Sequence, residues 1–263
     1  MPSWPAVIVG AVVLGALVGA AQPSQDEAAQ PMPEPVTQPD DQASASPEPT
    51  SSPDPSASSW PLGVTATLPG SVDPPRIALT FDDGPDPRWT PQVLDVLARY
   101  DVTATFCVVG DQVTGREPIV QRIHAEGHVV CNHSMTHDYG LASRDPERVT
   151  AEIDTVTRLV EQAAPQAAVS AFRAPGGRFA PGLVDEARDL GLHSWAWSVD
   201  SADWATDDSD EIVAAVLDDV APGAVVLLHD GGGNRSATVA ALGEIIPVLA
   251  SVGYEFVGLP DLS

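Results

Sequence analysis

The chain has 263 residues, enough for one domain of about 200 residues with additional terminal segments. It carries 37 acidic and 12 basic residues, all 12 of them arginine, and its net charge is −25. This balance excludes a nucleic-acid-binding surface, which needs cations to neutralise phosphates, and the absence of lysine excludes Schiff-base chemistry and a P-loop lysine. A neutral or cationic polymer remains an acceptable partner.

Residues 6–21 are almost wholly Ala, Val, Ile, Leu and Gly, and the run ends in small residues. The run is shorter than the roughly 20 residues of a membrane span, and its small final residues suit signal-peptide cleavage, although residues 1–5 contain no Lys or Arg. We expect residues 1–21 to be a signal peptide of a secreted or cell-envelope protein. An uncleaved segment that tethers the protein to a membrane is the alternative.

Residues 22–59 are mainly Pro, Ser, Ala, Gln and acidic residues, with Met32 and Val36 as the only large apolar side chains. Such a segment buries too little surface to offset its ordering entropy. We therefore expect a disordered linker over residues 22–70, followed by one folded domain over residues 71–263. The linker is either a spacer between the domain and the cell surface or a dispensable tail.

Strand-like and helix-like segments alternate from residue 76 onward. The patterns predict strands at residues 76–80, 104–109, 128–132, 171–172, 193–199, 224–228 and 255–257. They predict helices at residues 90–100, 116–126, 182–190, 210–220 and 238–251, and another that begins at residue 146. A capping residue precedes proline at Thr90-Pro91 and Asp145-Pro146, as is typical of helix starts. The alternation predicts an α/β fold with a parallel sheet.

Five of the predicted strands end in a polar cluster. The clusters are Asp82-Asp83-Gly84, residues 132–137, residues 173–177, residues 200–204 and His229-Asp230. Parallel strands gather their carboxyl ends at one face, so the five clusters can converge on one site. A barrel is favoured over an open sheet, because an open sheet has only one such crevice.

The clusters contain the residues of a metal-assisted hydrolase. His133 and His137 are four residues apart, which can aim both imidazoles at one point, and Asp82-Asp83 can complete a two-histidine, one-carboxylate set. Neighbouring residues point in different directions, so one aspartate can bind a metal while the other acts as a base. Taken alone, Asp-Asp-Gly would be an ordinary turn.

The two cysteines, Cys107 and Cys131, lie in consecutive predicted strands. Consecutive strands often neighbour each other, and an exported protein folds in an oxidising environment. We therefore expect a disulfide between them, and two buried free thiols are the alternative.

The ordered motifs resemble those of the polysaccharide deacetylase family, carbohydrate esterase family 4. They are Thr-Phe-Asp-Asp-Gly at 80–84, His-Ser-Met-Thr-His at 133–137, Arg-Ala-Pro-Gly-Gly at 173–177, Asp-Ser-Ala-Asp-Trp at 200–204 and Leu-Leu-His at 227–229. The resemblance covers about residues 75–260 and implies a deformed (β/α) barrel of about seven parallel strands. It also implies Asp83, His133 and His137 as ligands of zinc or another divalent transition metal.

The same resemblance implies the roles of the other motif residues. Asp82 would be the catalytic base, which Arg173 orients and keeps ionised, because an arginine is a fixed planar donor. His229 would be the catalytic acid, and Asp200 would hydrogen-bond it and raise its pKa. The remaining motif residues, Trp204, Leu227 and Gly176, would contact the substrate.

Gly176 stands where the family usually has tyrosine. Its backbone N–H, the family's oxyanion donor, is retained, and Trp204 and Leu227 would line the pocket for the acetyl methyl group. The lost phenol therefore bears on substrate choice more than on the chemistry.

The resemblance implies a metal-dependent N-deacetylase of a polysaccharide, with peptidoglycan or chitin-type oligomers as the expected substrates, and we expect it to be a monomer. O-deacetylation of acetylxylan is one alternative. A non-catalytic carbohydrate-binding protein on the same scaffold and a metal phosphodiesterase are others. The carbohydrate-binding protein would predict a damaged site, and the phosphodiesterase would need more basic residues or a second metal cluster.

Overall fold

The computed structural model describes residues 60–262, so the predicted signal segment and residues 22–59 of the predicted linker lie outside the described residues. None of the helices in this part of the chain is long and apolar enough to cross a membrane. The strands are β1 Val64–Thr65, β2 Arg76–Asp82, β3 Thr105–Val108, β4 Val129–Asn132, β5 Ala171–Phe172, β6 His193–Trp195, β7 Val199–Asp200, β8 Val225–His229 and β9 Glu255–Phe256.

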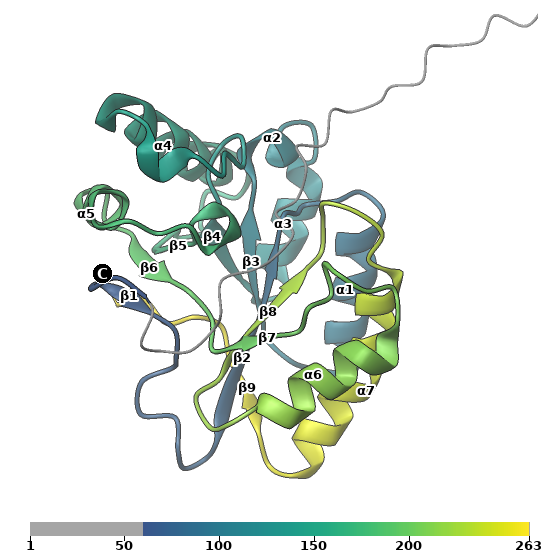
Figure 1. Ribbon diagram of the computed structural model, residues 1–263. Coiled ribbons are helices and arrows are strands. Elements are labelled where there is room, and N and C mark those ends of the chain that lie inside the picture. Colours follow the sequence, from purple (N-terminus) through teal and green to yellow (C-terminus); the bar gives the residue numbers. More distant parts are fainter. Residues whose placement is uncertain (1–59, 263) are drawn as a thin grey trace, which may run out of the picture. The chain divides into compact units, whose positions relative to one another are not determined.

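Seven α-helices alternate with these strands within the described residues. They are α1 Trp89–Tyr100, α2 Gly110–Val113, α3 Glu117–Ala125, α4 Pro146–Ala163, α5 Pro181–Asp189, α6 Ser209–Asp219 and α7 Ser236–Ser251, with short 3-10 helices η1 Leu141–Ser143 and η2 Pro175–Gly177. The predicted cap at Asp145 is present, because its side chain accepts a hydrogen bond from the Arg148 N–H. Helices α1, α6 and α7 lie together on one side of β2 and β8 (Figure 1).

The strands form one parallel sheet in the order β1-β6-β5-β4-β3-β2-β8-β7, with β9 paired to β2. The chain itself connects the two ends of the sheet, because β6 lies next to the edge strand β1 at one end and the next strand along the chain, β7, is the edge strand at the other. Between them, the Ala196 N–H donates to the Thr65 carbonyl and the Ser198 N–H donates to the Val225 carbonyl. The predicted deformed barrel is confirmed, as a curved sheet whose two ends are linked by residues 196–198.

Most predicted boundaries lie within two residues of the observed ones, but two differ by more. The predicted linker extended to residue 70, but Val64 of β1 pairs with Ser194 of β6, so these residues belong to the sheet. The predicted strand at 193–199 is broken into β6 and β7, because the chain leaves β6 near one end of the sheet and forms the edge strand β7 at the other end.

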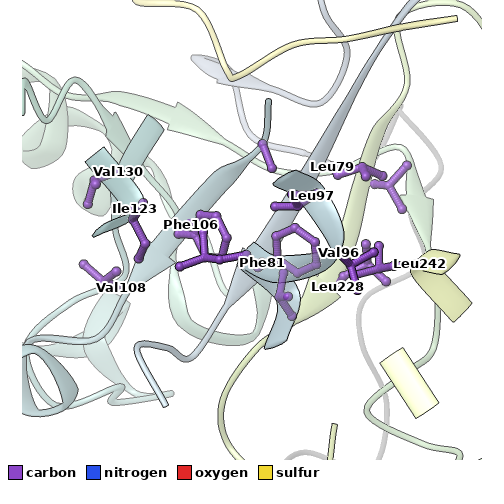
Figure 2. Packing of buried hydrophobic residues seen from close by; sticks show 14 of the residues in the cluster. Leu79, Phe81, Val96, Leu97, Phe106, Val108, Ile123, Val130, Leu228 and Leu242 are labelled. Atoms are coloured by element: carbon purple, nitrogen blue, oxygen red, sulfur yellow. The ribbon is translucent and has the colours of Figure 1, made fainter. Parts of the chain in front are cut away.

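Side chains alternate along the strands between a face that packs against the helices and the opposite, concave face of the sheet. In β2, Ile77, Leu79 and Phe81 enter the main apolar core beneath the helices. Phe81 stacks on Phe106 of β3 with ring centroids 5.1 Å apart, and Figure 2 shows both rings beside Leu97 of α1. The intervening side chains of β2, Ala78, Thr80 and Asp82, therefore point to the concave side of the sheet.

The concave face carries one row of register partners near the carboxyl ends of the strands. Asp82 of β2 is paired with His229 of β8 on one side and with Cys107 of β3 on the other, and Cys107 is paired with Cys131 of β4. The structure joins Cys107 and Cys131 through a disulfide, and both residues are fully buried. The disulfide therefore links β3, the neighbour of the strand that carries Asp82, to β4 on the far side of β3.

Candidate active site

Asp82 is held by a fully buried arginine. The Arg173 Nη1 donates to Asp82 Oδ1 at 2.8 Å and to the Thr80 hydroxyl at 2.8 Å. The same guanidinium donates to the carbonyls of Trp195 at 3.2 Å and Ala196 at 3.1 Å. Because the four contacts together use all three guanidinium nitrogens, the guanidinium is held in one orientation and in turn orients the Asp82 carboxylate.

Asp83, His133 and His137 offer three donor atoms that all lie within 4.8 Å of one another. Asp83 Oδ1 is 3.5 Å from His133 Nε2 and 3.1 Å from His137 Nε2. The Nδ1 of His133 donates to the Arg173 carbonyl at 2.8 Å, so its Nε2 is the ring nitrogen that faces the Asp83 carboxylate.

A second observation, in addition to the residue types, indicates that this cluster suits a divalent metal ion. Asp83 Oδ1 is buried and has no hydrogen-bond partner, although His137 Nε2 is close, so the three groups converge without satisfying one another. Burial alone would raise the pKa of Asp83, but the two imidazoles outweigh it and hold that pKa well below its usual range. Two imidazole nitrogens and one carboxylate oxygen suit zinc and similar transition metals.

The backbone at this cluster is unusual in a way that positions its side chains. Asp83 has φ 75° and His137 has φ 53°, both in the left-handed region that non-glycine residues rarely occupy. Such conformations persist where surrounding structure enforces them, and they gather at functional sites.

The turn after β8 packs directly on Asp83. A Cβ at Gly231 would lie 2.2 Å from the Asp83 carbonyl oxygen, and a Cβ at Gly232 would lie 2.6 Å from Asp83 Oδ2. Gly232 also has φ +71°, so it combines a close approach with a conformation that favours glycine. The glycine run at 231–233 is therefore part of the support of this cluster.

His229 is bonded to Asp203, whereas the sequence analysis expected Asp200. His229 Nδ1 donates to Asp203 Oδ1 at 2.7 Å, and the His229 N–H donates to Asp203 Oδ2 at 2.9 Å. Thr238 also donates its hydroxyl to Asp203 Oδ2 at 2.8 Å. Burial lowers the pKa of His229, but the Asp203 charge and hydrogen bond outweigh that effect and raise the pKa to about 9.

Asp200 has a different partner set, so the predicted bond to His229 was wrong. Asp200 Oδ1 accepts from the Ala202 N–H at 2.9 Å and from the Trp204 indole N–H at 3.4 Å. Its pKa is raised by burial. Ala202 has φ 54°, and the resulting turn brings Asp203, rather than Asp200, beneath His229.

Eight of the ten predicted site residues line one cavity, and Asp200 is not among its lining residues. The cavity is lined by Asp82, Asp83, His133, His137, Tyr139, Gly176, Trp197, Trp204, Leu227 and His229. Arg173 lies behind this lining as the fully buried partner of Asp82. Gly176 has φ +58°, which a tyrosine at this position would adopt only with strain.

Sequence reasoning missed four residues that support or line this cavity: Asp203, Thr238, Tyr139 and Trp197. The motif at 200–204 contains two aspartates, so it held a signal for Asp203 without distinguishing it from Asp200. Tyr139 follows His137 closely enough to have been considered with it. Thr238 lies at the start of α7, far from every motif, and no sequence signal pointed to it.

The chain is similar to deacetylases over the domain that carries this cavity. A family model for polysaccharide deacetylases matches residues 70–195. A chitooligosaccharide deacetylase of Bradyrhizobium sp. (strain ANU 289) is 42% identical over 197 residues, covering 71% of this chain and 90% of that protein. A peptidoglycan-N-acetylglucosamine deacetylase of Bacillus cereus is 40% identical over 188 residues, covering 71% of this chain and 87% of that protein.

A solved structure is similar as well. The crystal structure of the Bc1960 peptidoglycan N-acetylglucosamine deacetylase superimposes with a TM-score of 0.71 and 34% identity, covering 75% of this chain and 91% of that one. The resemblance drawn from the five motifs is thus confirmed by whole-domain similarity. The chain belongs to the polysaccharide deacetylase family, carbohydrate esterase family 4.

Proposed function

We propose that this protein is a metal-dependent enzyme that hydrolyses the acetamide group of N-acetylated sugars in a polysaccharide. The observation that carries the proposal is the juxtaposition of a three-donor cluster with a separate carboxylate and a separate imidazole. Asp83, His133 and His137 form the cluster, while Asp82 is bonded to Arg173 and His229 to Asp203. Amide hydrolysis needs an activated water, a base and an acid, and the cavity offers a group for each.

Asp83, His133 and His137 would hold the ion, for which we propose zinc. A divalent ion held there supplies Lewis acidity, which makes water a competent nucleophile near neutral pH. Asp82 is the proposed base, because Arg173 holds its carboxylate in one orientation within the cavity. Such positioned proton acceptors contribute about 10²–10⁴-fold to turnover.

His229 is the proposed acid. Because its Nδ1 is bonded to Asp203, its Nε2 is the nitrogen left to donate a proton to the departing sugar amine. The raised pKa keeps the ring protonated at neutral pH, so the proton is present when the carbon–nitrogen bond breaks.

The rest of the lining suits the acetyl group. The Gly176 N–H is the proposed donor to the developing oxyanion, a contact worth roughly 2.7–4 kcal/mol in other hydrolases. Trp204 and Leu227 line the cavity with apolar surface, as a methyl group requires.

Several further features are part of the proposal. We propose that the protein is secreted or envelope-associated, with residues 1–21 as a signal peptide or membrane tether, and that it acts as a monomer. The Cys107–Cys131 disulfide is consistent with an oxidising compartment. Asp83 and its neighbours make a bare carbohydrate-binding role the weaker alternative, because a binding protein needs no such cluster.

The test is acetate release by the purified, metal-loaded protein from chitin oligomers, peptidoglycan and acetylxylan, before and after chelation. We expect acetate from an N-acetylated glycan, loss of that activity on chelation and its return when zinc is added back. Acetate from acetylxylan alone would favour the O-esterase. Binding of the glycans with no acetate release from any of them would contradict the enzymatic function.

A further inference from the structure

An aromatic ring and an exposed cation stand together at the edge of the candidate active site. Tyr139 lines the cavity, and its ring lies edge-on to the ring of His137, with centroids 4.8 Å apart. The Arg178 guanidinium carbon lies 5.0 Å from the centroid of the same Tyr139 ring. Arg178 comes from the segment after η2, so this contact joins the loop that follows β4 to the loop that follows β5.

Arg178 differs from most arginines of residues 60–262 because it makes no ion pair with this part of the chain. Six others are paired with carboxylates: Arg122, Arg144, Arg148, Arg158, Arg173 and Arg188. Its side chain is exposed, and both Tyr139 and Gly176, two residues before Arg178, line the cavity. A cation with no carboxylate partner is therefore available beside the cavity.

Because the protein carries a large net negative charge, the position of the Arg178 cation bears on the charge of the substrate. Seven of the 37 acidic residues and none of the 12 basic residues lie in residues 1–59, so residues 60–263 carry a net charge of −18. A negative field repels an anionic substrate at long range, whereas a neutral glycan needs no cation at all. A substrate with a carboxylate next to the hydrolysed sugar would need local compensation, and an exposed arginine beside the cavity provides it.

On the basis of the proposed function, we propose that Arg178, seated on Tyr139, selects a glycan in which the sugar next to the hydrolysed N-acetylglucosamine carries a carboxylate. Peptidoglycan strands whose stem peptides have been removed have this chemistry, because alternate sugars then bear a lactyl ether that ends in a free carboxylate; in strands that keep the peptides, this carboxyl group is an amide. Chitin is uniformly neutral and lacks it. Tyr139 positions the guanidinium and offers a flat apolar face to the sugar ring.

The test compares oligosaccharides that differ only in this charge. Peptide-free peptidoglycan tetrasaccharides are used as the free lactyl acids and as their methyl esters, with chitotetraose as a neutral reference. The metal-loaded full chain should show a kcat/KM about five-fold higher for the acids than for the esters at low salt, as expected for one exposed ion pair. The preference should reside in KM and should shrink as ionic strength rises.

Variants then locate the preference. Arg178→Gln should abolish the difference between acid and ester and leave kcat/KM on chitotetraose within two-fold, and Arg178→Lys should restore part of the difference. Arg188→Gln is the control, because it removes one exposed arginine of α5 that pairs with Asp185 and is not part of the cavity lining. It should leave the preference intact.

The outcomes separate this proposal from the one on which it rests. Equal rates on acid and ester in the unaltered protein, or an Arg178→Gln defect of equal size on all three substrates, would overturn the selection of a carboxylate while leaving the deacetylase intact. No acetate from any substrate would overturn both.

Discussion

Replacing Asp203 by asparagine tests the assignment of the partner of His229. The raised pKa of His229, about 9 against an ordinary 6.5, depends on the Asp203 carboxylate. This difference corresponds to about 3 kcal/mol in favour of the protonated ring. Without the charge, burial is the main remaining influence and pushes the pKa to 6.5 or lower. At pH 7.5 the protonated fraction should fall from nearly all of the molecules to about one tenth or less.

The assay is kcat as a function of pH for the metal-loaded protein. A general acid is active while protonated, so activity should be lost as the pH rises through its pKa. We expect Asp203→Asn to move this alkaline limb downward by about two pH units and to reduce kcat at pH 7.5 by at least about ten-fold. A bound cation lowers the pKa of His229 in both proteins, so the difference between their limbs is the informative quantity.

Asp200→Asn is the matched control, because Asp200 lies in the same motif but bonds to Ala202 and Trp204. It should leave the alkaline limb in place. Thermal unfolding of both variants identifies a simple loss of folding. If Asp200→Asn moved the limb and Asp203→Asn did not, the reasoning from the observed hydrogen bonds would be refuted.

Three other substitutions follow from the structure. Asp82→Asn should retain one metal ion per chain and lower kcat by at least about 10²; undiminished turnover would remove Asp82 as the base. Gly232→Ala should weaken metal affinity by about ten-fold or more, because its Cβ would lie 2.6 Å from Asp83 Oδ2. Gly243→Ala in α7, where a Cβ would meet nothing within 4 Å, should leave metal affinity unchanged in a metal titration. Trp60→Ala should lower both melting temperature and kcat, with partial recovery in Trp60→Phe, because the Trp60 ring packs 5.2 Å from Trp197 and 5.8 Å from Phe179; wild-type values would show that the segment before β1 is dispensable.

The sequence predicted the parts of the fold that local patterns determine. Alternation in β2 separates Phe81 on the packing face from Asp82 on the concave face, and helix caps such as Asp145 mark where helices begin. The convergence of Asp83, His133 and His137 followed from the rule that parallel strands end at one face. The strand faces and helix starts depend on residues close in sequence, and the convergence follows from a general rule of parallel sheets, so both can be predicted before the structure is known.

The features that were not predicted from the sequence depend on contacts between residues far apart in the chain or on local backbone angles. The run at 193–199 has the composition of one strand, and only its pairing at opposite ends of the sheet divides it into β6, which lies beside β1 and β5, and β7, which pairs with β8. β1 has two residues and follows a linker-like stretch, so its pairing with β6 left no local signal. Choosing between Asp200 and Asp203 required the turn at Ala202, whose positive φ no composition reveals.

The proposed activity depends on one metal ion held by Asp83, His133 and His137. The most direct measurement is calorimetric titration of the metal-free protein with zinc, alongside His133→Ala and His137→Ala. We expect the unaltered protein to bind one zinc ion per chain tightly, and we expect each variant to lose this tight zinc binding. Full binding in both variants, or acetate release that survives exhaustive chelation, would contradict it.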